Sequence, residues 1–150
     1  MTRKAAPLPV PEACVDALRS ATMRAVKSKD TRPERLVRSL AHRLGFRFRL
    51  HRADLPGSPD LVFPGRRAAV FVHGCFWHGH DCRRGARAPK TNAAYWRAKI
   101  ARNRARDETA AAALAALGWR VLTIWECETA DAAALERRLS GFLRAGAENV

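Results

Sequence analysis

The run Ala68–Val72 constrains the fold of this chain more than any other segment. It holds five consecutive apolar residues, AAVFV, with no polar position among them. A strand with one face in water alternates apolar and polar residues, whereas an unbroken apolar run of this length is typical of a strand covered on both faces. The sequence therefore predicts a central strand at 68–72, with other elements packed above and below it.

The flanking segments predict the remaining elements. Thr31, Pro33 and Glu34 fit a capping box at the start of a helix, and Gly45 predicts its end. Alternation of apolar and basic residues predicts a half-buried strand at 46–51 with a basic outer face. The other expected elements are helices at 12–26, 92–117 and 130–145, a strand at 60–63 and a buried strand at 119–125. This order favours a single-domain α/β fold, a central mixed sheet flanked by helices, and the 150 residues suit one domain.

The positive charge of the chain is concentrated in two segments. The chain has 28 Lys and Arg against 14 Asp and Glu, and residues 83–106 hold nine basic residues and no acidic one. Residues 24–52 hold ten basic and two acidic residues, whereas residues 107–150 hold seven acidic and four basic ones. Lysine and arginine neutralise phosphates and release counterions, so this distribution indicates a nucleic-acid partner. A solubility device or a general bias toward arginine is the alternative.

The sequence excludes several other protein classes. No apolar run approaches the roughly 18–20 residues of a membrane span. The N-terminal Met1–Lys4 has no apolar stretch behind it, so we expect no secretory signal and a cytoplasmic protein, associated with the nucleoid when bound to DNA. Composition is that of a globular chain, with 47% hydrophobic and 28% charged residues. We expect no membrane partner.

Cysteine and histidine residues form a candidate metal site. Cys75, His80 and Cys82 share one short loop, and Cys127 follows the end of a predicted strand. Three cysteines and one histidine are a common ligand set of closed structural zinc sites. The alternative is buried free cysteines beside a surface histidine. Cys14, on the first predicted helix, is interpreted as a small buried apolar residue.

Two further histidines, His73 and His78, lie beside these ligands within a six-residue window. A single histidine is usually an ordinary surface or core residue. A pair next to a metal site and a strongly basic segment favours proton transfer, because the pKa of histidine lies near neutrality.

Three segments together resemble the very short patch repair (Vsr) endonuclease family. They are GSPDLV at 57–62, VFVHGCFWHGHDC at 70–82 and WRVLTIWEC at 119–127, and MRAVKSKDTRPE at 23–34 resembles the family's N-terminal signature. The resemblance covers about residues 18–145, and the run HGCFWHGHDC is highly specific. It implies an endonuclease domain at 18–145 with a PD-(D/E)xK restriction-endonuclease-like core and a structural zinc site, between a flexible arm at 1–17 and a tail at 146–150. It also implies Mg²⁺-dependent nicking of one DNA strand at a thymine mispaired with guanine, the product of 5-methylcytosine deamination.

The resemblance implies a role for each matching residue. Asp60 would bind Mg²⁺ together with the backbone carbonyl of Val72, and Glu34 would reach the hydrated ion. His78 would act as general base or acid, and His73 would support it near the scissile phosphate. The zinc ligands would be Cys75, His80, Cys82 and Cys127. Many family members have a hydroxyl residue in place of Val72, and a backbone ligand tolerates that change.

The resemblance also implies aromatic wedges that enter the duplex beside the mismatch, where unstacking costs least. The candidates are Phe76, Trp77 and Trp96; core packing is the alternative and is the interpretation we give Trp119, Trp125, Phe46, Phe48, Phe63 and Phe71. Lys99, Asn103 and Arg106 recur at helical spacing and could follow the DNA backbone, although a solvated helix face explains them almost as well.

Three functions follow from these observations. The first is a monomeric mismatch nickase that acts on double-stranded DNA containing a T:G mismatch, with structural Zn²⁺ and catalytic Mg²⁺. The second is a restriction-like endonuclease without mismatch specificity. The third is a non-catalytic, zinc-stabilised DNA-binding module, which would leave Asp60, Glu34, His73 and His78 without a role.

Overall fold

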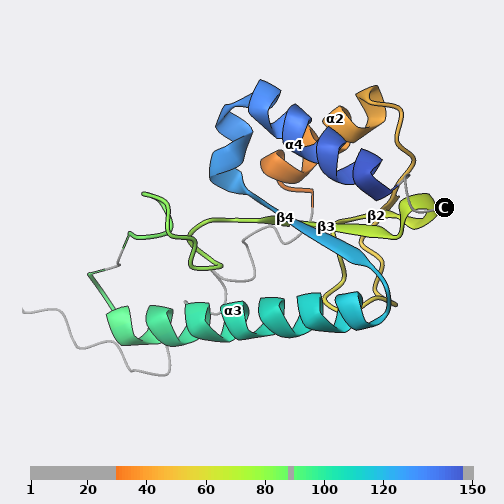
Figure 1. The fold of residues 1–150 in the computed structure, drawn as a ribbon. Coiled ribbons are helices and arrows are strands. Elements are labelled where there is room, and N and C mark those ends of the chain that lie inside the picture. Colours follow the sequence, from red (N-terminus) through yellow and green to blue (C-terminus); the bar gives the residue numbers. More distant parts are fainter. Residues whose placement is uncertain (1–29, 88–89, 147–150) are drawn as a thin grey trace, which may run out of the picture. The chain divides into compact units, whose positions relative to one another are not determined.

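The structure is a computed structural model that describes residues 30–87 and 90–146 (Figure 1). The chain divides into two units, Met1–Thr31 and Arg32–Val150, and nearly all of the described residues belong to the second. The helix expected at 12–26, the arm at 1–17, Cys14 and most of the 23–34 signature lie outside the described residues.

A four-stranded mixed sheet forms the centre of this unit. Its strands are β1 (Arg49–Leu50), β2 (Leu61–Phe63), β3 (Ala68–His73) and β4 (Arg120–Trp125), in the spatial order β1-β2-β3-β4. The first three strands pair antiparallel, whereas β3 and β4 are parallel, with His73 opposite Trp125. The predicted mixed sheet is confirmed.

Helices cover both faces of the sheet (Figure 1). Leu40 of α2 (Arg32–Arg43) and Leu139 of α4 (Ala132–Ala145) share one core with β2 and β3, and Leu114 of α3 (Ala93–Ala116) belongs to a second core. Successive residues of β3 serve the two cores, since Val70 lies in the first and Phe71 in the second. The prediction of a central strand covered on both faces is therefore confirmed.

Short helical turns at Pro64–Arg66 (η1) and Glu126–Ala130 (η2) follow β2 and β4. No helix within residues 30–87 and 90–146 has both the length and the apolar character needed to cross a membrane.

Two strand predictions differ from the structure. The strand expected at 46–51 is limited to Arg49–Leu50, because its partner β2 ends at Phe63 and is followed by Pro64, which has no N–H to continue the ladder. The strand expected to be buried at 119–125 is an edge strand of the described sheet, and only Ile124 in it is fully buried. Its apolar residues reflect partial cover by helices on both faces.

Two glycines let the loops around the site approach α3 closely. Gly57 has φ +75°, and a Cβ there would lie 2.6 Å from the Cβ of Ala110. Gly79 has φ +63°, and a Cβ there would lie 2.7 Å from Ile100. Any side chain would be strained and would clash at both positions. The turn before Asp60 and the loop after His78 are thus both packed against α3.

Candidate active site and metal centre

Two carboxylates, one buried and one partly buried, lie at one end of the sheet and are here called the carboxylate pair. Asp60 directly precedes β2, and Glu34, in the first turn of α2, is only 2% exposed. Asp60 Oδ2 accepts a hydrogen bond from the backbone N–H of Val72 at 2.7 Å. Burial raises the pKa of Asp60 to about 7, the Val72 N–H opposes this rise, and the Glu34 carboxylate adds to it. This pair concentrates negative charge where water is largely excluded.

His51 links the two carboxylates, and the sequence analysis missed it. Arg38 donates to Glu34 Oε2 and lies 2.9 Å from His51 Nε2. A guanidinium only donates, so Nε2 must accept and the ring proton is on Nδ1. Nδ1 is 3.8 Å from Asp60 Oδ1, which directs the N–H toward that carboxylate. His51 also has a left-handed backbone (φ 47°), a costly conformation for a non-glycine residue that often marks functional sites.

The predicted proton-transfer residues His73 and His78, here called the histidine pair, are brought together. Their rings stack with centroids 3.8 Å apart and planes 3° from parallel. Asp107 of α3 lies 2.6 Å from His78 Nδ1 and 3.8 Å from His73 Nε2. A carboxylate accepts hydrogen bonds, so the neutral form of His78 carries its proton on Nδ1 and has its lone pair at Nε2. The sequence analysis missed Asp107, although it is the first acidic residue after the basic segment 83–106.

The geometry of the histidine pair suits proton transfer better than metal binding. A bound metal lies near the plane of each imidazole that holds it, and two parallel rings 3.8 Å apart share no such position. Burial, helped by the charge of His78, lowers the pKa of His73 to about 4, so His73 is neutral near pH 7. Its Nδ1 is buried and has no hydrogen-bond partner among the described residues.

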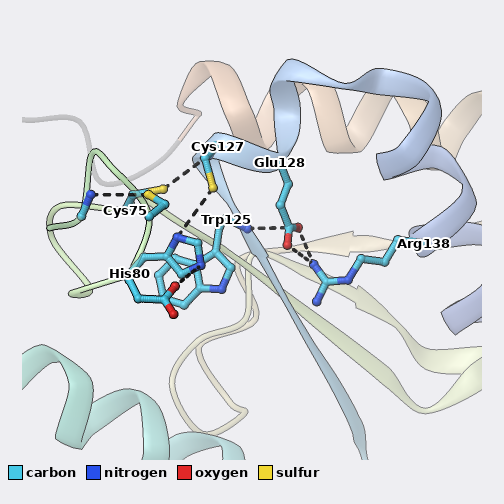
Figure 2. A network of polar contacts seen from close by, with 9 residues as sticks. Cys75, His80, Trp125, Cys127, Glu128 and Arg138 are labelled. Atoms are coloured by element: carbon cyan, nitrogen blue, oxygen red, sulfur yellow. Dashed lines mark hydrogen bonds and ion pairs between the residues drawn. The ribbon is translucent and has the colours of Figure 1, made fainter.

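The four predicted zinc ligands also meet. Residues 74–85, here called the metal loop, supply three of them, and Cys127 comes from η2 beyond β4 (Figure 2). All four ligand atoms lie within 4.8 Å of one another, and His80 Nδ1 is 3.6 Å from Cys127 Sγ. Tetrahedral zinc with metal–sulfur bonds of about 2.3 Å needs ligand separations of about 3.8 Å, so the arrangement fits. The three cysteines of this set, Cys75, Cys82 and Cys127, form no disulfide.

The surroundings of the thiols support a metal centre. Backbone N–H groups of Cys127 and Gly85 donate to Cys75 Sγ and Cys82 Sγ, each at 3.4 Å. Burial raises the pKa of Cys75 to about 12, whereas the Gly85 N–H lowers the pKa of Cys82 to about 6. The buried Cys75 therefore needs a neighbouring cation to exist as the thiolate that binds metals.

The three predicted wedge residues form one aromatic cluster. Ring centroids of Phe76, Trp77 and Trp96 are 5.1–5.8 Å apart, and all three side chains are partly exposed. Asn103 donates to the Trp77 carbonyl at 2.8 Å, so its amide supports the metal loop from within the protein. Arg106 is exposed and donates to Asn103 Oδ1. Lys99 is half-buried on the same helix.

Comparisons with known proteins identify the family of the chain. The family model of the DNA mismatch endonuclease Vsr matches residues 13–84. The type II nicking enzyme V.XorIIP of Xanthomonas oryzae pv. oryzae is 61% identical over 121 residues, which cover 81% of this chain and 88% of that protein. The DNA mismatch endonuclease Vsr of Escherichia coli is 44% identical over 111 residues, covering 74% of this chain and 70% of that protein. The type II nicking enzyme V.NmeAIP of Neisseria meningitidis is 40% identical over 126 residues, covering 84% and 89%. The resemblance found in the sequence is thus confirmed, and the chain belongs to the Vsr family of DNA endonucleases.

Proposed function

We propose that this protein hydrolyses one phosphodiester bond of duplex DNA at a T:G mismatch, with Mg²⁺ as its catalytic cofactor. One observation carries the proposal: the carboxylate pair and the histidine pair adjoin at a single strand end. Asp60 contacts the backbone of Val72, and the next residue along β3 is His73. An acidic oxygen site beside a pair of imidazoles that can transfer protons is what metal-assisted phosphodiester hydrolysis requires.

Asp60 and the backbone carbonyl of Val72 would hold Mg²⁺, with Glu34 reaching it through water. A buried and a partly buried carboxylate fit a hard cation with oxygen ligands. In an extended strand, the N–H and C=O of one residue point to the same side. The Val72 N–H points to Asp60, so the Val72 carbonyl is expected on the Asp60 side as well. When bound, Mg²⁺ neutralises the phosphate oxygens and stabilises the developing charge.

The histidine pair and Asp107 would move the proton. His78 Nε2 removes a proton from the attacking water, and the Asp107 carboxylate holds the His78 ring and stabilises its charged form. His73 remains neutral and stacked on His78, so it fixes the ring plane without adding a second positive charge. Its Nδ1 is buried and without a partner among the described residues, so it could bind an ordered water.

Zn²⁺ would have a structural role. Four protein ligands leave no open coordination position, so Cys75, His80, Cys82 and Cys127 would close the metal loop onto η2. We further assign the domain to 18–145, with a PD-(D/E)xK core formed by β2, β3 and the helices around them, an arm at 1–17 and a tail at 146–150.

Mismatch selectivity would come from the aromatic cluster. Phe76, Trp77 and Trp96 lie together and are partly exposed, which supports insertion into a duplex. Unstacking a base step costs a few kcal/mol, and it costs least where pairing is already defective. Lys99 and Arg106 would contact the backbone beside the wedge, and Asn103 would hold Trp77 in place.

Nicking of matched synthetic duplexes tests the proposal. Purified protein should cut the thymine strand of a T:G duplex in Mg²⁺ and leave the T:A duplex of the same sequence intact. Asp60→Ala should abolish cutting, whereas Asp54→Ala should not, because Asp54 is an exposed carboxylate paired with Arg52 in the same turn region. Equal cutting of both duplexes would favour a restriction-like endonuclease. Tight binding without hydrolysis in any divalent metal would favour a DNA-binding module.

A further inference from the structure

One indole ring touches both the metal centre and the histidine pair. Trp125 is the last residue of β4 and lies opposite His73 in the β3–β4 register. Its ring stacks on His80 at 4.2 Å with planes 14° apart. The same ring meets His73 edge-on at 5.4 Å and His78 at 6.4 Å. Three of the five histidines of the chain thus surround a single side chain.

Contacts with η2 and α4 hold the backbone of Trp125 in place (Figure 2). Its backbone N–H donates to the carboxylate of Glu128 at 3.4 Å, and Arg138 of α4 binds both oxygens of that carboxylate. Its β-strand pairing with β3 restrains the backbone further. The indole is therefore a rigid surface against which three imidazole rings are oriented.

We propose that Trp125 is a positioning residue that transmits the geometry of the metal centre to the histidine pair. The inference rests on the proposed function, since it concerns proton transfer by His78. His80 directs Nδ1 toward Cys127 Sγ, so the metal centre sets the plane of the ring on which the indole stacks. The edge of the indole then limits how far His73 and His78 can tilt. Ordinary core packing, our interpretation from sequence, does not account for contacts with a metal ligand and two site residues at once.

Substitution of Trp125 should lower the nicking rate much more than the affinity for DNA. Trp125→Leu removes the flat ring, and we expect the single-turnover nicking rate to fall about 10–100-fold with DNA affinity changed less than about threefold. Trp125→Phe keeps a flat ring and should recover most of the rate. Zinc should remain near one ion per chain in both variants.

Trp119→Leu is the matched control. Trp119 lies next to the other end of β4 and packs in the Phe71–Leu114 core, with Arg67 over its ring. The same substitution there should lower stability but leave the nicking rate of the folded protein unchanged. Equal rate losses at both positions, or a loss in Trp125→Leu that only follows zinc content, would overturn the proposal.

Histidine resonances test the geometry without reference to activity. In the unmodified protein, nuclear Overhauser contacts should connect the Trp125 indole with ring protons of His80 and His73. Trp125→Leu should shift the ring signals of all three neighbouring histidines, and Trp119→Leu should shift none. Absence of these contacts in the unmodified protein would overturn the inference even if Trp125→Leu fails to fold. Absence of nicking with the contacts present would refute the proposed function instead.

Discussion

Replacing Asp60 by asparagine should stabilise the Mg²⁺-free protein while abolishing its activity. The pKa of Asp60 is raised from 3.8 to about 7 in the folded state, chiefly because the carboxylate is buried. A carboxyl with a raised folded pKa favours folding below pH 3.8, and that contribution is lost as the pH rises through 7. At pH 8 the folded protein therefore carries an ionised carboxylate that the unfolded chain would hold at lower free energy.

The magnitude follows from the two pKa values. One pKa unit corresponds to about 1.4 kcal/mol. Relative to a pH below 3.8, the raised pKa of Asp60 therefore lowers the free energy of unfolding by about 4 kcal/mol at pH 8 and by about 2 kcal/mol at pH 5. The side chain is 15% exposed, so solvent screens part of the cost and these values are upper limits. Asparagine removes the charge and keeps an oxygen to accept the Val72 N–H.

Urea unfolding at pH 5 and pH 8 in Mg²⁺-free buffer measures this effect. The gain in free energy of unfolding of Asp60→Asn over the parent should be larger at pH 8, by up to about 2 kcal/mol. Added Mg²⁺ should stabilise the parent and not the variant. Asp54→Asn is the control, since its exposed carboxylate is paired with Arg52 and should give no such gain. A gain that is equal at both pH values, or a loss at pH 8, would refute the reasoning.

Four further outcomes are expected. Asp107→Asn should lower the nicking rate about 10²–10⁴-fold with little change in DNA affinity. Glu108→Gln is the control, because Glu108 is exposed on α3, and it should leave the nicking rate unchanged. An unchanged rate in Asp107→Asn would show that Asp107 is not part of the site. His51→Ala should raise the Mg²⁺ concentration for half-maximal nicking, whereas His42→Ala, which is exposed on α2, should not; identical Mg²⁺ titrations would contradict the role of His51. Elemental analysis should find about one zinc per chain, with less in Cys127→Ala, and a metal-free active parent would exclude the centre. DNA affinity should fall steeply with salt, and Arg106→Ala should reduce the logarithmic slope by about 1; an affinity insensitive to salt would contradict the electrostatic interpretation.

Sequence patterns predicted the parts of the site that are local in the chain. The apolar run at 68–72 predicted the central strand, and the spacing of Cys75, His80 and Cys82 predicted three side chains of one loop that the structure brings together. Patterns of this kind work because neighbouring residues in a strand or tight loop stay close in space. Cys127 was within reach of the same reasoning because it follows a strand end.

Sequence patterns did not predict the site residues that only tertiary packing brings to the site. Asp107 is one acidic position on a long helix, and nothing in the helical period shows that it faces His78. His51 was assigned to the basic outer face of the strand expected at 46–51, but its backbone is left-handed and its side chain lies between two carboxylates. The strand at 46–51 was overextended because periodicity records burial and does not record where a partner such as β2 ends at Pro64.

The attachment of α3 divides the helix into two parts. Its buried residues, Ala110 and Leu114, both lie in its C-terminal half, where they meet the sheet. The preceding part touches the metal loop instead, through the Asn103 bond to Trp77 and the close approach of Ile100 to Gly79. The N-terminal half of α3 is therefore attached to the metal loop, whereas its C-terminal half is attached to the sheet, and Asp107 lies between these two attachments. The His78–Asp107 contact thus joins the metal loop to α3 at the point where the helix passes from the loop to the sheet.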